Sequence, residues 1–155
     1  MMKRHDNLQP LSRQHHHELM ACLLLKKGIQ KEADLPVMQA FTRQFWNTDL
    51  ALHVKAEETT LIPLLMATPS LKHYAVVLHN DHELIETIFE RSQDGYLSYR
   101  MLELFADTLE EHIRFEERVV FSAMQEELPD SAWNALRFKE GTDNDCVNYP
   151  VKFWE

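Results

Sequence analysis

Hydrophobic residues recur along most of the chain at intervals of three and four positions, the spacing of one face of an α-helix. This pattern predicts four long amphipathic helices, separated by short segments of turn and capping residues. The expected helices span about 8–28, 34–63, 68–93 and 96–128. Because the connections are short, consecutive helices should run antiparallel. The sequence therefore predicts an all-α fold, an up-down-up-down four-helix bundle.

Glycine and proline positions are expected to set the ends of these helices. Gly28 suits the residue after a helix C-terminus, where a left-handed conformation is common. Pro63 lacks the backbone N–H that a helix interior needs, so it should kink or end the second helix. Pro129 should end the fourth helix for the same reason.

The residues after Pro129 predict a C-terminal extension. A short helix is expected at about 130–139, followed by an aromatic tail at 141–155. The tail is too apolar for a purely solvated end, so we expect it to pack on the bundle or on a partner; its apolar residues are Cys146, Tyr149, Phe153 and Trp154. The expected organisation is a single domain over 1–155, with its bundle at about 8–128 and the extension at 129–155.

Composition narrows the function classes. The 155 residues suit one domain, and the 3 glycines form neither a G-x-G-x-x-G motif nor a phosphate-binding P-loop. A formal net charge of −9 disfavours nucleic acid and anionic membranes as partners. The two cysteines make no disulfide framework, and neither a signal peptide nor a membrane span is evident. We therefore expect a cytoplasmic protein, and homodimerisation is left open.

The most informative feature is a repeated motif. The segment His53-Val-Lys-Ala-Glu57-Glu58 has the same form as His112-Ile-Arg-Phe-Glu116-Glu117. In a helix, positions i and i+4 share one face, so each histidine and the first glutamate of its motif can bind one metal ion or two adjacent ions. In both segments this is the hydrophobic face, where an uncompensated carboxylate would cost several kcal/mol. A bound cation would remove that cost.

The other two helices also offer inward histidines. His82 shares a face with Leu78, Ile85 and Phe89 in the third helix. In the first helix His16 is preferred and His15 is the alternate, because the leucines at +3 and +7 from His16 match the apolar residues at the same offsets from His82. Four imidazoles and two carboxylates suit iron or manganese. The expected metal ligands are His16 (or His15), His53, Glu57, His82, His112 and Glu116.

Together these features resemble the haemerythrin-like, or HHE cation-binding, domain family. The resemblance covers about 8–128 and rests on the two His-x-x-x-Glu-Glu segments, on Asp81-His82 and on the histidine cluster of the first helix. It implies a non-haem di-iron centre, oxo- or hydroxo-bridged, in proteins that bind or sense O₂, handle nitric oxide or peroxide, or sense iron. The O₂-carrying members have a second histidine one turn before the residue that His82 matches. Here that position is Leu78, and His79 lies three residues before His82.

Three functions follow from these expectations. The leading one is a di-iron protein that binds or senses O₂ or a related small oxidant such as nitric oxide, with no catalytic residues assigned. The first alternative is a di-iron enzyme of nitric oxide or peroxide reduction or of iron–sulfur repair, and the second is an interaction module with a vestigial metal site. Glu58 and Glu117 are expected to be exposed; the alternative is that they bind the metal as bidentate ligands or hold a residue that binds it. Without metal, repulsion between Glu57 and Glu116 should raise the carboxylate pKa values.

Overall fold

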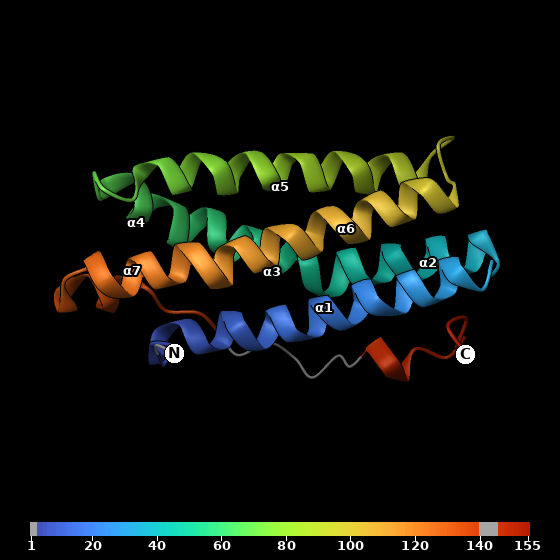
Figure 1. Cartoon of the computed structure of the whole chain (residues 1–155), viewed down its shortest axis with the longest axis horizontal. Coiled ribbons are helices and arrows are strands. Elements are labelled where there is room, and N and C mark those ends of the chain that lie inside the picture. The colour runs from blue at the N-terminus through green and yellow to red at the C-terminus, as the bar shows by residue number, and fades with distance from the viewer. Residues whose placement is uncertain (1–2, 140–145) are drawn as a thin grey trace.

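Helices make up all the regular structure in the described part of the chain. The structure, a computed structural model, describes residues 3–139 and 146–155, and within these ranges it contains no strand. Four long rods lie side by side (Figure 1). The first rod is α1 (Gln9–Gln30), entered through a 3₁₀ turn at Asp6–Leu8, and the third is α5 (Lys72–Gln93). The second comprises α2 (Leu35–Phe45), α3 (Ala51–Ala56) and α4 (Ile62–Ala67), and the fourth comprises α6 (Tyr99–Phe115) and α7 (Phe121–Glu127).

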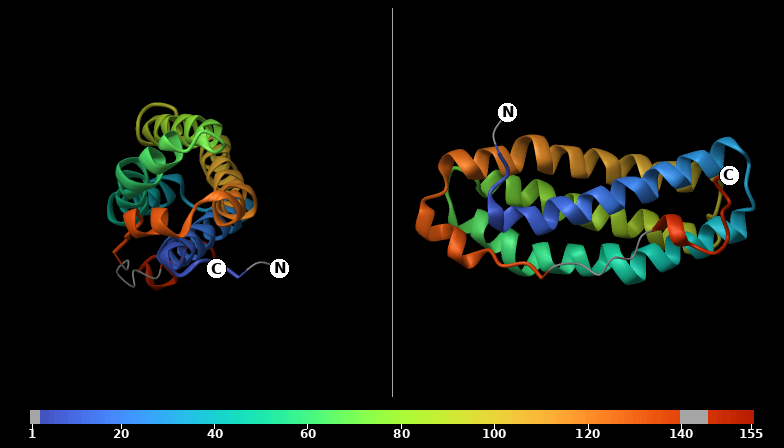
Figure 2. Two further views of the ribbon diagram at one scale, coloured as in Figure 1. Left: turned by 90° about the vertical axis from the view of Figure 1, so that its left-hand side faces the viewer. Right: turned by 90° about the horizontal axis from the view of Figure 1, so that it is seen from below.

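Consecutive rods run in opposite directions, and the end-on view in Figure 2 shows them around a common axis. The all-α, up-down-up-down bundle is thus confirmed. Capping residues explain where two rods begin. The Asp34 side chain accepts a hydrogen bond from the Val37 N–H at the start of α2, and Ser98 does the same for Met101 at the start of α6.

The expectation that Gly28 ends the first helix is wrong. Helix α1 continues through it to Gln30, and the chain then turns at Glu32, whose φ is +53°. Gly28 instead makes room for the C-terminal tail. A Cβ at this position would lie 2.6 Å from Cδ2 of Phe153, closer than any real contact. Glycine is therefore required here by close packing, rather than by its backbone conformation.

The second and fourth rods each contain π-helical turns. These lie at Trp46–Leu50 and Glu57–Leu61 in the second rod and at Glu116–Val120 in the fourth. Pro63 does not end the second rod, which continues to Ala67. In the turn just before Pro63, the N–H of Ile62 donates to the carbonyl of Glu57, five residues back. Such a wide turn inserts an extra residue into the helix and is frequent at functional sites.

The C-terminal extension packs on the bundle, as expected. Its first part is a 3₁₀ helix at Asp130–Ala135, shorter than the helix expected at 130–139, and it buries Trp133. Of the expected tail, 141–145 lie outside the described residues. The remainder covers the end of the bundle near α1 and α2 (Figure 2). Three of its rings lie around Phe41, with centroid distances of 5.1, 5.0 and 6.3 Å for Tyr149, Phe153 and Trp154.

The hydrophobic core consists of two separate clusters. One lies around Phe41 and Phe105, at the end where α1 meets α2. The other lies around Leu11, Leu65 and Phe121, at the opposite end. Between them, on all four rods, the sequence places buried histidines and glutamates. No helix in the described ranges is long and apolar enough to cross a membrane.

Candidate metal centre

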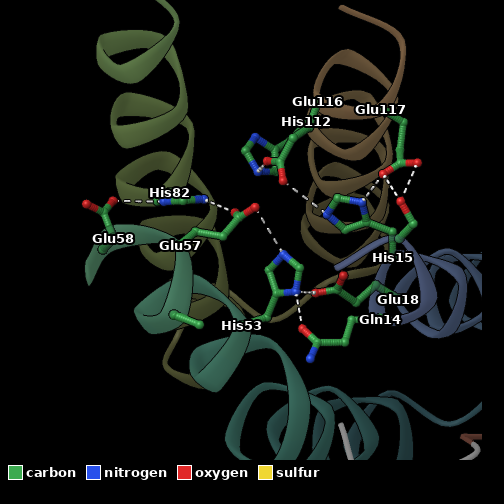
Figure 3. Close-up of polar contacts among 12 residues, drawn as sticks. Gln14, His15, Glu18, His53, Glu57, Glu58, His82, His112, Glu116 and Glu117 are labelled. Carbon is green, nitrogen blue, oxygen red and sulfur yellow. Dashed lines mark hydrogen bonds and ion pairs between the residues drawn. The ribbon is translucent and has the colours of Figure 1, made fainter. Parts of the chain in front are cut away.

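Four histidines and two glutamates converge at the middle of the bundle (Figure 3). All six side chains are buried, and they come from all four rods. Helix α1 supplies His15, α5 supplies His82, and the two repeated motifs supply the other four: His53, Glu57, His112 and Glu116.

Each carboxylate lies between two imidazoles from different rods. Glu57 has one oxygen 3.4 Å from Nε2 of His53 and the other 3.0 Å from Nε2 of His82. Glu116 lies in the same way, 3.3 Å from Nε2 of His15 and 3.2 Å from Nε2 of His112. All four histidines therefore direct the same ring nitrogen, Nε2, at the carboxylate pair.

These six residues form two groups that could each hold a metal ion. In each group the donor atoms lie within 4.8 Å of one another, and both groups include Glu57 and Glu116. His15 and His53 complete one group, and His82 and His112 complete the other. Since carboxylates can bridge two ions, the arrangement suits a pair of cations that share both glutamates.

Several of the donor atoms are buried but have no hydrogen-bond partner. Within the described part of the chain, His15 Nε2, Glu57 Oε2 and both oxygens of Glu116 make no hydrogen bond. A buried polar group without a hydrogen bond costs about 1–3 kcal/mol, and a buried charge costs more. A cation at the centre would satisfy these atoms together. Mixed imidazole and carboxylate donors suit iron or manganese better than calcium, because calcium prefers sites made only of oxygen atoms.

The outward nitrogen, Nδ1, of each of these four histidines also has a hydrogen-bond partner. Nδ1 of His15 lies 2.9 Å from Glu117, and Nδ1 of His82 lies 2.8 Å from Glu58. Nδ1 of His53 lies 2.6 Å from Gln14 Oε1, and Nδ1 of His112 lies 3.0 Å from Asp81. An Nδ1–H that donates outward leaves Nε2 free to bind a metal, which is the usual arrangement of histidine ligands.

Glu58 and Glu117 are therefore not the exposed neighbours that were expected. Their side chains are 28% and 26% exposed, and each fixes the ring of an inward histidine on another rod. The π turns that begin at Glu57 and Glu116 account for this arrangement. In both turns the first glutamate is buried at the centre, and the next residue reaches a neighbouring rod.

The structure brings five of the expected ligand residues together, and the α1 histidine that joins them is His15, the alternate to His16. His53, Glu57, His82, His112 and Glu116 meet as anticipated, but His16 is exposed and His15 is the inward residue of α1. The offset comparison misled because it counted only apolar residues. Leu23, on which it relied, is 45% exposed, whereas the residue at +3 from His15 is Glu18, a buried polar residue.

Two contributors were not anticipated in these roles: Gln14 and Asp81. Gln14 and Asp81 directly precede His15 and His82, so they share the same register in the two halves of the molecule. That correspondence was readable in the sequence once His15 was chosen. His79 takes no place at the centre, because it is half-exposed and bonds Glu58.

Protonation compensates the buried carboxylates when no metal is bound. Burial favours a neutral imidazole, but the hydrogen bond to Asp81 and the neighbouring carboxylate of Glu116 outweigh it and raise the pKa of His112 to about 10. Burial alone would raise the pKa of Glu57, yet the facing His53 and His82 lower it well below its usual range. The expectation of a raised carboxylate pKa is therefore wrong for Glu57, since the histidines take up the protons. Glu18 differs: burial raises its pKa, and the charges of His53 and His15 offset this only in part.

Comparison with known protein families agrees with this geometry. Residues 6–124 match the family described as Hemerythrin HHE cation binding domain. Neither the curated proteins nor the solved structures give a match. The matched range contains all six residues of the centre and both repeated motifs. The chain belongs to the hemerythrin HHE cation-binding domain family.

Proposed function

We propose that this protein holds two iron ions and binds or senses O₂ or a related small oxidant such as nitric oxide. The observation that carries the proposal is the pair of two-histidine groups that share Glu57 and Glu116. Two iron ions bound there would supply one-electron redox chemistry toward such ligands. The chain's own residues orient the imidazoles and keep the centre buried between two apolar clusters.

The residue one turn before His82 favours a sensing or redox role over reversible oxygen transport. This residue is Leu78, which is fully buried and donates nothing to a metal. Leu11 takes the corresponding place one turn before His15 and is also fully buried. Each group therefore offers only two imidazoles, and both ions would keep room for an exogenous ligand.

The same observation supports an enzyme as the second candidate. Open positions on both ions would suit the reduction of nitric oxide or peroxide, or the donation of iron during iron–sulfur repair. A cytoplasmic location and a small diatomic ligand, rather than nucleic acid or membrane, remain part of the proposal. Turnover with peroxide or nitric oxide in stopped-flow measurements separates an enzyme from a binding protein.

Metal analysis of aerobically purified protein tests the proposal most directly. We expect two irons per chain and absorption bands near the ultraviolet edge of the visible spectrum. Replacing His53 and His112 together with alanine should abolish both the stoichiometric iron and the bands. A wild-type protein that stays folded yet binds no iron, or binds manganese in preference when both are supplied, would contradict the iron assignment.

A further inference from the structure

The two halves of the metal centre correspond residue by residue. His15 on α1 corresponds to His82 on α5, and His53 in the first motif corresponds to His112 in the second. The residue before each of the first pair accepts a hydrogen bond from one of the second pair. These contacts join Gln14 to His53 and Asp81 to His112.

The two halves differ in charge at two pairs of corresponding positions. Asp81 presents a carboxylate to His112, whereas Gln14 presents a neutral amide oxygen to His53. The opposite difference occurs at the residue three positions after His15 and His82. There α1 carries Glu18 and α5 carries Ile85, both buried. The carboxylate absent from one position of the first half is thus present at another.

Glu18 lies where it could act on His53. Its Oε1 is 3.7 Å from Nδ1 of His53, on the side of the ring that faces away from Glu57 (Figure 3). The side chain is 2% exposed, and neither carboxylate oxygen makes a hydrogen bond to any described residue. A buried carboxylate without a hydrogen bond is costly and calls for a reason. Glu18 belongs to neither group of donor atoms, so its position does not make it a ligand.

We propose that Glu18 is a positioning residue that gives His53 the negative charge that Asp81 gives His112. The inference rests on the proposed metal-binding function and adds a role for a residue outside the ligand set. With Glu18 included, each half of the centre has two carboxylates behind its histidines. These are Glu117 and Glu18 in one half and Glu58 and Asp81 in the other. A carboxylate beside the outward nitrogen makes an imidazole a stronger metal ligand.

An exchange of two side chains tests this role. Glu18→Gln removes the charge with almost no change of shape. It should weaken the binding of one of the two ions by about 10–100-fold, the usual effect of losing such a partner. Adding Gln14→Glu places a carboxylate at the atom that already lies 2.6 Å from His53 Nδ1. The double variant should therefore recover most of the lost affinity.

The measurement is an anaerobic titration with Fe²⁺ against a competing chelator, with circular dichroism to show that each variant folds. Glu86→Gln is the matched control, because Glu86 lies one turn after His82 but is exposed. Unchanged affinity in Glu18→Gln would overturn the proposal. So would a loss that Gln14→Glu does not restore, since Glu18 would then be a ligand itself or only a packing group.

A second readout uses the metal-free protein. The ¹⁵N chemical shifts of the His53 ring should change in Glu18→Gln and return toward the wild-type values in the double variant. His112, held by Asp81, should keep its shifts in both variants. A wild-type protein that binds no iron would defeat the proposed function, whereas these shifts would still decide whether Glu18 acts on His53.

Discussion

At the scale of single residues, the clearest contrast is between His15 and its neighbour His16. His15 is buried with Nε2 facing Glu116 and Nδ1 held by Glu117, whereas His16 is exposed. We predict that His15→Ala removes tight binding of one of the two ions, because its group keeps a single imidazole. His16→Ala should bind two ions as the wild type does. Iron analysis after gel filtration measures both; a loss confined to His16→Ala would show that the site is misassigned.

The motif residues could be predicted because the i, i+4 spacing determines their relation within one helix. His53 and Glu57, like His112 and Glu116, needed no knowledge of the neighbouring rods. The choice between His15 and His16 depended on how α1 is rotated in the bundle, and apolar residues alone left this open. The roles of Gln14 and Asp81 were not predicted, and a supporting role for Glu58 and Glu117 was only the alternative, since each of these four residues acts on a histidine of another rod.

Leu78 gives a second prediction at this scale. With no donor one turn before His82, an iron ion there keeps an open position, so diferrous protein should oxidise rapidly in air instead of binding O₂ reversibly. Azide and nitric oxide should bind readily. Leu78→His adds an imidazole on the same face, and we expect it to lengthen the lifetime of any oxygenated form, measured by stopped-flow absorbance.

The corresponding variant on the other half is Leu11→His, one turn before His15. It shows whether any added buried histidine has this effect or only one on α5. Circular dichroism must show that both variants fold, because each buries a polar ring among apolar side chains. A wild-type protein that binds and releases O₂ over many cycles without oxidising would restore the oxygen-carrier interpretation.

At the scale of the elements, helix periodicity gave the number, order and direction of the rods. It could not give the π turns, because a wide turn depends on how a rod packs and on where a site glutamate must point. Two of the three π turns begin at Glu57 and Glu116, which ties the local helix geometry to the metal centre. Gly28 was misread for a similar reason: the need for glycine came from Phe153, which is distant in sequence.

The contact between Gly28 and the tail predicts an unusual response to alanine. In most exposed helix positions Gly→Ala stabilises a protein, because alanine has the higher helix propensity. Here the new Cβ would lie 2.6 Å from the Phe153 ring and 2.9 Å from Met38 Cε, so the tail must shift. We expect Gly28→Ala to lower the free energy of unfolding by about 1–3 kcal/mol, as overpacking does.

Urea denaturation followed by circular dichroism measures this change. Gly95→Ala is the matched control, since a Cβ there would meet no described atom within 4 Å. Iron binding should persist in both variants, because the tail packs on the cluster around Phe41 and lies away from the metal centre. If Gly28→Ala is as stable as the wild type, the tail does not press on α1 in solution.

At the scale of the whole molecule, two apolar clusters enclose a charged layer. Both clusters span all four rods, so the bundle should remain folded without metal. The buried glutamates of this layer carry negative charges that are costly away from water. Metal ions or protonated histidines can neutralise these charges. The stability of the metal-free protein should therefore depend on pH more strongly than that of the metal-loaded protein.

The sign of that dependence follows from the histidines. All four have a raised pKa in the folded metal-free protein, which for His112 reaches about 10, above an unfolded value of about 6.5. A group with a raised pKa stabilises the fold fully below its unfolded pKa, and this stability is lost as the pH rises through its folded pKa.

The urea concentration at the unfolding midpoint of the metal-free protein should therefore decrease as the pH rises from 6.5 to 10. The metal-loaded midpoint should be higher at pH 8 and change less over this range, because metal-bound imidazoles carry no titrating proton. Asp81→Asn replaces the charged acceptor that raises the pKa of His112 with a neutral amide oxygen, so in metal-free protein it should lower the pH at which stability begins to fall. Equal midpoints for the metal-free and metal-loaded proteins at pH 8 would show that no ion is held by the buried carboxylates.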